Sequence, residues 1–383
     1  MEKKKIMITC SRGISPFLEK EVKGLGLPVI SSTSTGIETL GSFDDTLMLN
    51  LHIRTGQRVL FFLKEFSVYS IEDFYAGVKS IKWESLIDER GYVCVTSSVD
   101  SPLITDSRFA NQKCKDAIVD RIKERTGKRP DSGPNKDRAV VFIYWNGRKC
   151  SVFIDTSGEP LFKRGYRIKQ LAAPMQETLA AAVVMATGWH GKGHLINPMC
   201  GGGTIAIEAA LMASGTAPGL SRNNFGFMHI KNFKKSIWDR LVNNAKRAVK
   251  DPGTLIIATD RSKKAVEASE INAIAAGVDG SMDLKVCDFR NTDIPEGGGI
   301  IIFNPEYGER MGKGSDLGPI YKDIGDFLKQ RGSGYMGYVF TGNLGMAKKV
   351  GLRTKSRKQF YSGGIECRLL EYDLYEGSRK KRP

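Results

Sequence analysis

The alternation of strand and helix patterns from about residue 170 onward limits the folds open to this chain more than any other feature. Short apolar runs at residues 194–197, 254–259 and 299–303 are typical of strands, and helical apolar spacing over 204–213 and 263–276 separates them. Strands joined by helical crossovers form a parallel sheet, and ligands of such sheets bind at the carboxyl ends of the strands. The sequence therefore predicts an α/β domain with functional residues directly after its strands.

A glycine-rich turn follows the first of these strands. It reads Asn197-Pro198-Met199-Cys200-Gly201-Gly202-Gly203-Thr204. Glycines let the backbone approach a ligand closely, and the start of the following helix suits a carboxylate or phosphate. This turn does not match the GxGxxG pattern of NAD-linked reductases, because Gly201-Gly202-Gly203 is followed by Thr204-Ile205-Ala206, and the GxxxxGK[ST] pattern of nucleotide hydrolases is absent, which disfavours these two classes. A tight turn without a ligand is the alternative for this segment taken alone.

Two acidic residues end the next strands of the predicted sheet. Asp260 ends the second strand, where a carboxylate can accept hydrogen bonds from ribose hydroxyls. Asp288 follows a strand over 284–286, where an acceptor can meet an adenine amino group. Either aspartate alone is equally compatible with a turn or an N-cap. Their occurrence at consecutive strand ends, together with the glycine turn, favours S-adenosylmethionine as cofactor.

The strand over 299–303 ends in the sequence Asn304-Pro305-Glu306-Tyr307. An Asn side-chain oxygen and a neighbouring backbone carbonyl can accept both hydrogens of an exocyclic amine, which aims the nitrogen lone pair at a sulfonium methyl. Proline stiffens such a loop, and Tyr307 can stack on an extruded base. We predict a methyl-transfer site here, with a simple Asn-Pro turn as the alternative.

The charge of the chain favours an anionic partner. The net charge is +16, and nucleic acid is the first candidate for such an excess. A predicted helix over 108–126 has an apolar face and a basic remainder, for which a solvated surface is the alternative to RNA docking. Its cations are Arg108, Lys113, Lys115, Arg121, Lys123 and Arg125.

Cysteine usage and hydropathy exclude several protein classes. The seven cysteines are scattered without a CxxC pair, which disfavours a disulfide framework and a zinc site. No apolar run is long enough to span a membrane, and no secretory signal is evident at the start. We therefore expect a reduced, cytoplasmic protein without a metal.

The first 158 residues have the mixed pattern of small α+β domains. Strands are predicted at residues 6–9, 92–96, 139–145 and 151–155, and a helix over 16–25. Two more strands are expected to flank residues 44–56, whose apolar face comprises Leu47, Leu49, Leu51 and Ile53.

Several segments in this order resemble class I methyltransferases that carry an N-terminal THUMP domain and act on RNA, with bacterial 23S ribosomal RNA guanine-N2 methyltransferases as the closest members. The segments are RFANQK at 108–113, DTSG at 155–158, KRGYR at 163–167, APMQETLAA at 173–181, NPMCGGGTIAIEAA at 197–210 and NPEYGER at 304–310. The resemblance implies a ferredoxin-like domain over 1–65, a THUMP domain over 66–158 and a Rossmann-like methyltransferase domain with a seven-stranded, mostly parallel sheet over 159–383.

The resemblance also implies residue roles. The turn Asn197–Thr204, with Asn197, Pro198, Cys200, Gly201, Gly203 and Thr204, would hold the methionine part of the cofactor, Asp260 the ribose and Asp288 the adenine. Pro174 and Glu177 would line the same pocket, and Asn304, Pro305 and Tyr307 would hold the guanine. RNA contacts are predicted at Arg108, Lys113, Lys115, Lys163, Arg164 and Arg167.

Two residues depart from the family pattern: Gly202 stands where serine is common, which should have a mild effect, and the other lies in the reaction loop. Glu306 replaces the second proline of the usual NPPY loop and brings a carboxylate near the target nitrogen. It can accept a proton or bond the guanine, and it can equally indicate an altered base or a weakened enzyme. The first hypothesis is guanine-N2 methylation of ribosomal RNA by a monomer or weak dimer. The alternatives are a tRNA guanine-N2 or adenine-N6 methyltransferase and a non-catalytic RNA-binding assembly factor.

Overall fold

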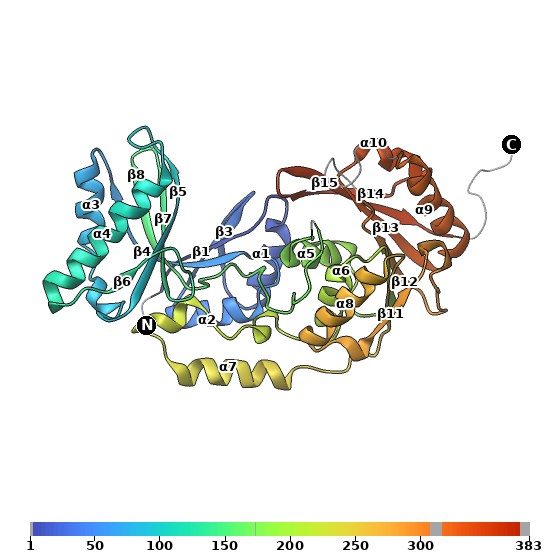
Figure 1. Cartoon of the computed structure of the whole chain (residues 1–383), viewed down its shortest axis with the longest axis horizontal. Coiled ribbons are helices and arrows are strands. Elements are labelled where there is room, and N and C mark those ends of the chain that lie inside the picture. Colours follow the sequence, from blue (N-terminus) through green and yellow to red (C-terminus); the bar gives the residue numbers. More distant parts are fainter. Residues whose placement is uncertain (1–2, 173, 307–315, 376–383) are drawn as a thin grey trace. The chain divides into compact units, whose positions relative to one another are not determined.

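The structure, a computed structural model, describes residues 3–172, 174–306 and 316–375 (Figure 1). Its chain forms two compact units. The N-terminal unit comprises Met1–Cys10, Leu18–Lys163 and Arg222–Asn244, and the C-terminal unit comprises Ser11–Phe17, Arg164–Ser221 and Ala245–Pro383. Among the described residues, none of the helices combines the length and the apolar composition that a membrane span requires.

The described part of the N-terminal unit contains one eight-stranded sheet in the order β2-β3-β1-β4-β8-β7-β5-β6. Its strands are β1 (Lys4–Thr9), β2 (Val29–Thr33), β3 (Gly36–Gly41), β4 (Arg58–Ser67), β5 (Tyr92–Asp100), β6 (Asp131–Ser132), β7 (Ala139–Asn146) and β8 (Lys149–Asp155). Strand β4 pairs antiparallel with both β1 and β8, so the ferredoxin-like and THUMP-like parts share one sheet. The boundary predicted after residue 65 falls within β4.

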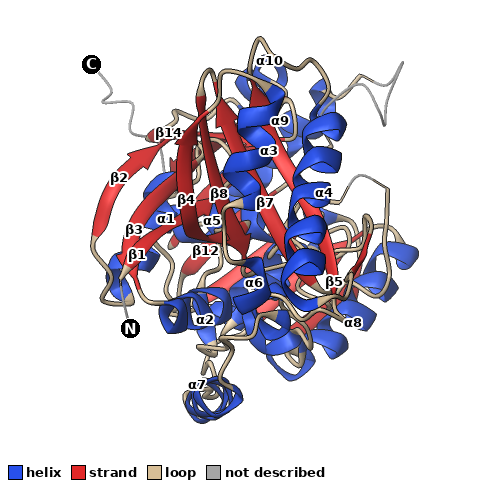
Figure 2. Ribbon diagram, turned by 90° about the vertical axis from the view of Figure 1, so that its left-hand side faces the viewer, coloured by secondary structure: helices blue, strands red, loops and turns tan. Residues whose placement is uncertain are grey.

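Amphipathic helices cover this sheet. They are α1 (Ser15–Gly24), α2 (Phe43–His52), α3 (Ile71–Lys79) and α4 (Ser107–Thr126), and Figure 2 shows α3 and α4 side by side. Helix α2 begins in a capping box between Ser42 and Asp45 and lies between β3 and β4, which confirms the two predicted flanking strands. Helix α4 buries its apolar face, as predicted from its spacing.

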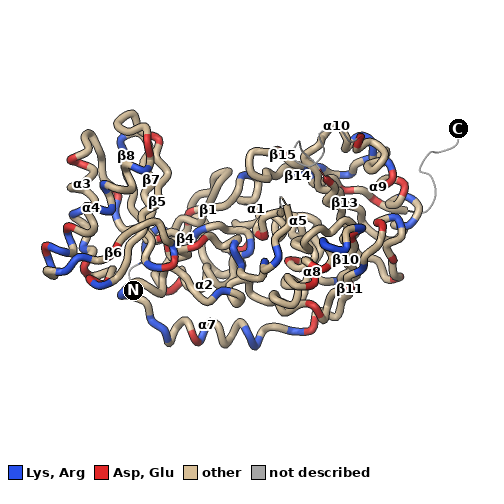
Figure 3. Tube along the Cα trace, in the orientation of Figure 1, with Lys and Arg blue, Asp and Glu red and all other residues tan. Residues whose placement is uncertain are grey.

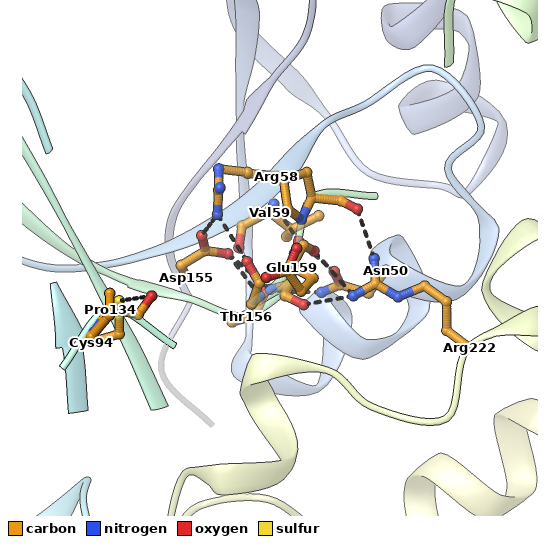
Figure 4. A network of polar contacts seen from close by, with 12 residues as sticks. Asn50, Arg58, Val59, Cys94, Pro134, Asp155, Thr156, Glu159 and Arg222 are labelled. Atoms are coloured by element: carbon orange, nitrogen blue, oxygen red, sulfur yellow. Dashed lines mark hydrogen bonds and ion pairs between the residues drawn. The ribbon is translucent and has the colours of Figure 1, made fainter. Parts of the chain in front are cut away.

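The DTSG segment is a buried polar junction within the N-terminal unit (Figure 4). Asn50 of α2 donates to Thr156 Oγ1 (2.9 Å) and accepts from Ser157 Oγ (2.6 Å), and Ser157 Oγ accepts from the backbone of Val59. Asp155 is ion-paired with Arg58. Buried polar groups that are satisfied in this way fix one arrangement of the chain. The segment therefore holds α2, β4 and β8 together.

The C-terminal unit contains a seven-stranded sheet in the order β11-β10-β9-β12-β13-β15-β14. Its strands are β9 (His194–Pro198), β10 (Ile256–Asp260), β11 (Met282–Val286), β12 (Gly299–Phe303), β13 (Tyr335–Thr341), β14 (Ser356–Ser362) and β15 (Ile365–Asp373). The first five in spatial order are parallel, and β15 pairs antiparallel with both of its neighbours, β13 and β14. This confirms the predicted Rossmann-like class and the mostly parallel sheet.

Helices connect these strands. They are α5 (Glu177–Thr187), α6 (Thr204–Ala213), α7 (Lys235–Arg247), α8 (Lys263–Ala276), α9 (Gly318–Arg331) and the short α10 (Leu344–Ala347). An apolar cluster packs α9 against the sheet, with Phe303 and Phe327 edge to face at a ring-centre distance of 5.7 Å. Burying such aromatic pairs fixes the end of β12, from which Asn304 extends.

Candidate functional site

Four loops that carry predicted functional residues leave the same edge of the sheet. Strands β11, β10, β9 and β12 are consecutive neighbours and all run parallel. Asp260 pairs in register with Val286, and Thr259 pairs with Pro198. Asp288, Asp260, the glycine turn and Asn304 therefore follow four adjacent strand ends. This arrangement creates the ligand-binding edge expected of such a sheet.

The glycine turn is built from residues in the left-handed conformation. The φ angles are +55° at Gly201 and +77° at Gly203, and Met199 at +59° is the non-glycine residue among those described that adopts a positive φ. Such a conformation costs a side-chain-bearing residue about 1 kcal/mol or more, and strain of this kind concentrates at functional sites. A Cβ at Gly201 would meet nothing within 4 Å, whereas one at Gly203 would lie 2.9 Å from Ser269 Oγ. Gly203 thus permits close packing against α8, and Gly201 faces open space.

Asp260 connects the second strand to this turn. One carboxylate oxygen accepts from the Gly201 backbone N–H at 3.0 Å, and the other accepts from Ser262 N–H at 2.9 Å. Each carboxylate oxygen can accept a further hydrogen bond. The residue can therefore hold the turn and still accept from ligand hydroxyls.

Two residues of α8 support the turn and were missed by sequence reasoning. Ser269 Oγ donates to the Gly201 carbonyl at 2.7 Å. Asn272, 2% exposed, donates to the carbonyls of Gly202 and Lys169 and accepts from Lys169 N–H. Both are polar positions on the otherwise apolar buried face of α8, and that irregularity was the available signal.

Cys200 lies inside the turn as a neutral thiol. Its backbone N–H donates to the Thr259 carbonyl, and its Sγ lies 3.7 Å from Ser269 Oγ. Burial raises the pKa of the Cys200 thiol to about 12, so this group is protonated at neutral pH. In the described ranges no three His, Cys, Asp or Glu side chains come together to hold a metal ion.

Two asparagines at neighbouring strand ends carry unused acceptors. The Asn197 amide donates to the Ile302 carbonyl at 2.8 Å, which ties β9 to β12. The Oδ1 atoms of Asn197 and Asn304 are buried and have no hydrogen-bond partner within the part of the chain that the structure describes. An unsatisfied buried acceptor costs about 1–3 kcal/mol, so both oxygens are suited to donors supplied by a ligand.

The segment after Asn304 is described only as far as Glu306. Pro305 is buried and Glu306 is exposed. The Glu306 carbonyl accepts from Tyr321 Oη at 3.4 Å, and the same hydroxyl pairs with Thr341 Oγ1 at 2.6 Å. Tyr321 therefore supports the loop from α9, and Tyr307 lies outside the described residues.

Asp288 is held by the residue two positions later. Its carboxylate accepts from the Arg290 backbone N–H at 3.0 Å and from the Arg290 guanidinium at 2.9 Å. It caps the short 3-10 turn Phe289–Asn291, and its side chain stays partly exposed. Asp288 is therefore an N-cap, and its contact with an adenine amino group stays a prediction.

The start of α5 is linked to the start of α6 by Arg167. Its guanidinium lies 3.1 Å from Glu177 and donates to the Met175 carbonyl at 2.6 Å and to Thr204 Oγ1 at 3.3 Å. Burial raises the pKa of Glu177, and the charge of Arg167 opposes that rise. The hydrogen-bonding groups of Arg167 are therefore used within the protein, where they link the end of the glycine turn to the start of α5. Helix α5 begins at Glu177 rather than residue 173, so Pro174 precedes it in an exposed position.

The prediction that Arg164 contacts RNA is wrong. The side chain is 2% exposed and is ion-paired with fully buried Glu208 of α6 at 3.2 Å, and Tyr166 Oη donates to the same carboxylate. Removing one partner of a buried ion pair costs about 3–5 kcal/mol, which makes this contact structural. A guanidinium enclosed in this way cannot reach a phosphate.

Of the other predicted RNA contacts, Arg108 and Lys163 are exposed and Lys113 and Lys115 are half-buried, whereas Arg167 is engaged with Glu177, Met175 and Thr204. Arg108 is 89% exposed and lies 2.8 Å from Asp106, Lys115 lies 3.1 Å from Asp116, and Lys163 lies 2.6 Å from Glu159. Lys113 lies over the Phe109 ring. Nearby carboxylates reduce the field that these cations present to an anion. Their RNA contacts stay a prediction.

Comparisons with protein families match three regions of the chain. Residues 5–60 match the RlmL ferredoxin-like domain, residues 68–155 the THUMP domain, and residues 164–371 the RMKL-like methyltransferase domain.

Relatives of known name cover nearly the whole chain. A ribosomal RNA large subunit methyltransferase K/L of Syntrophotalea carbinolica is 34% identical over 97% of this chain and 54% of its own length. A putative RNA methyltransferase of Synechocystis is 30% identical, and the match covers 96% of each. The chain spans about half the length of the K/L relatives it matches.

Solved structures share the whole fold. A putative methyltransferase designated SMU.472, solved in complex with SAH, has a TM-score of 0.88 at 25% identity over 100% of both chains. A predicted N6-adenine-specific DNA methylase from Listeria monocytogenes has the same score and identity over 98% of this chain and 97% of its own.

Proposed function

The chain belongs to the family of RMKL-like methyltransferases with ferredoxin-like and THUMP domains, and we propose that it methylates the exocyclic N2 amine of a guanine in ribosomal RNA with S-adenosylmethionine. The observation that carries this proposal is the placement of Asp288, Asp260, the glycine turn and Asn304 after four adjacent parallel strands. Adenine, ribose, methionine and target base would bind in that order along one edge of the sheet.

The residues present fit the cofactor. Gly201 faces open space, the N-terminus of α6 suits the methionine carboxylate, and Asn197 has an unused acceptor for its ammonium group. The Asp260 carboxylate would accept from the ribose hydroxyls and Asp288 from the adenine amino group. When bound, S-adenosylmethionine supplies an electrophilic methyl on its sulfonium. The SMU.472 protein, which shares the whole fold, was solved in complex with SAH, and this supports the assignment.

The unpaired oxygen of Asn304 supports the role given to the reaction loop. Asn304 Oδ1 and a backbone carbonyl of the loop would accept the two N2 hydrogens of guanine and direct the nitrogen lone pair away from the ring plane. Buried Pro305 restricts the loop, so the acceptors are positioned before the base arrives. Exposed Glu306 is the nearest carboxylate in sequence and would take the proton released after transfer.

Ribosomal RNA is the substrate that the charge and the relatives favour. The net charge of +16 attracts a polyanion, and relatives over 97% and 96% of the chain are named for ribosomal RNA methylation. We propose the ferredoxin-like part over 1–65 and the THUMP part over 66–158 as the docking region, and residues 159–383 as the catalytic region. The protein would act as a monomer or weak dimer.

Methyl transfer to two RNA classes tests the proposal. Purified protein is incubated with isotope-labelled S-adenosylmethionine and either ribosomal RNA lacking its natural methyl groups or tRNA. We expect label in ribosomal RNA and heat of binding for the cofactor in calorimetry. Label in tRNA alone would contradict the substrate, and an absence of cofactor binding would favour a non-catalytic assembly factor.

A further inference from the structure

The chain between α6 and β10 leaves the C-terminal unit and contributes a long exposed helix. Residues Arg222–Asn244 of this insertion belong to the N-terminal unit, and Ala245 begins the return. The backbone N–H of Phe227 donates to the Thr156 carbonyl, and that of Lys231 donates to the Leu86 carbonyl. The insertion therefore anchors the start of α7 on the N-terminal unit.

An aromatic cluster fixes this anchor. The rings of Phe225 and Phe227 stack at 5.1 Å, and Trp238 of α7 lies 5.0 Å from Phe227 and 5.3 Å from Phe225. The Arg222 guanidinium covers the Phe225 ring at 4.5 Å. Buried aromatic pairs of this kind contribute about 0.5–1.5 kcal/mol each beyond their area. The aromatic cluster therefore fixes the position of α7 on the N-terminal unit.

The two sides of α7 differ in chemistry. Its apolar residues are buried or half-buried, namely Ile237, Trp238, Leu241, Val242 and Ala245. Its four cations are all exposed, namely Lys235, Arg240, Lys246 and Arg247. At the helical repeat, these cations fall within an arc of about 140° opposite the apolar side and extend over about 18 Å. They form one continuous basic face, which we call the α7 basic face.

The charge on this face is largely uncompensated. Residues 231–250 contain seven Lys and Arg and one acidic residue, Asp239, and among the three cations outside the face Lys231 is paired with Glu89 at 3.6 Å. Asp239 pairs with Lys235 at 2.7 Å, and no carboxylate in the described part of the chain is paired with Arg240, Lys246 or Arg247. Figure 3 shows Lys and Arg along α7 with little acid between them. On α4, by contrast, Arg121 is paired with Glu84, and the predicted contacts Arg108 and Lys115 have acid partners.

We propose that the α7 basic face binds the phosphate backbone of the RNA substrate. This inference rests on the proposed function, because it takes RNA as the substrate. A row of cations, three of which have no carboxylate partner among the described residues, releases counterions from a polyanion without reading its bases. The face would supply affinity, and base choice would stay with the Asn304 loop.

The test compares two triple variants of the full chain. The first is Arg240→Gln, Lys246→Gln and Arg247→Gln on α7. The matched control is Lys192→Gln, Lys329→Gln and Arg353→Gln, which removes the same charge from exposed cations of the C-terminal unit that lie outside the candidate site and outside the proposed docking region. Affinity for deproteinised 23S ribosomal RNA is measured between about 0.1 and 0.5 M salt, and cofactor binding is measured in parallel.

The α7 variant is expected to bind RNA roughly 50-fold more weakly at about 0.15 M salt, with a log–log salt slope smaller by about 2, because three contacts each contribute about 0.7 to the slope. The control should stay within about threefold of wild type, since cations that contact no phosphate release no counterions when RNA binds. Equal losses in both variants, or wild-type affinity in the α7 variant, would overturn the inference. If the wild-type protein neither binds nor methylates RNA, the proposed function itself fails.

Discussion

Replacing Asn304 by alanine is expected to reduce kcat for methyl transfer by about 100- to 1000-fold while cofactor affinity stays near wild type. The size follows from losing one preorganised hydrogen-bond group aimed at the reacting atom. The Asn304 oxygen is buried and has no hydrogen-bond partner among the described residues, so we propose that its acceptor capacity serves a ligand. Single-turnover kinetics with ribosomal RNA and calorimetry with S-adenosylmethionine measure the two effects separately.

The matched variant is Asn304→Asp, which keeps an oxygen at the position of Oδ1. It should retain at least ten times the activity of the alanine variant, because the acceptor for the amine hydrogens is preserved. Unchanged turnover in Asn304→Ala would remove this residue from the mechanism. A similar loss in both variants would show that the amide group, and not its acceptor oxygen, matters.

Asp260→Ala is expected to weaken S-adenosylmethionine binding by about 100-fold. Hydrogen bonds to a charged group are worth about 1.5–3 kcal/mol each, and a tenfold change corresponds to about 1.4 kcal/mol. The variant removes the acceptor for ribose and also the bond that holds the Gly201 N–H. Calorimetric titration with the cofactor gives the change directly.

Asp251→Ala serves as the control for this variant. Asp251 accepts from the backbone two residues later at 2.9 Å, as Asp260 does from Ser262, but it precedes β10 in an exposed loop. Its replacement should leave the cofactor Kd within about twofold. Wild-type cofactor affinity in Asp260→Ala, or an equal loss in both variants, would disprove the assigned role.

The parallel part of the sheet was predictable because each strand and helix there has a clear period. Helices α6 and α8 and strand β12 have the predicted bounds. In each case a glycine, serine or other polar residue at one end interrupts the apolar pattern of the element. Strands β14 and β15 were not predicted. Their sequences mix charged and apolar residues, and they become strands by pairing antiparallel with each other and with β13.

The candidate site was predictable where a functional residue comes directly after a predicted strand. The glycine turn, Asp260, Asp288 and Asn304 each stand next to a run that the sequence identifies, and the parallel order brings them together.

Arg164 shows the limit of such reasoning. KRGYR resembles an exposed basic segment in sequence, and only the fold brings Glu208, 44 residues later, into contact with Arg164. Long-range partners of this kind have no local signal. The contacts of Ser269 and Asn272 with the glycine turn could not be predicted from the sequence for the same reason.

The identity of the methylated nucleoside tests the central claim most directly. Ribosomal RNA lacking its natural methyl groups is incubated with the protein and methyl-labelled S-adenosylmethionine, digested to nucleosides and analysed by mass spectrometry. The proposed site predicts labelled N2-methylguanosine, which is absent when Asn304→Ala replaces the wild-type protein. Labelled N6-methyladenosine, or no labelled nucleoside despite bound cofactor, would contradict it.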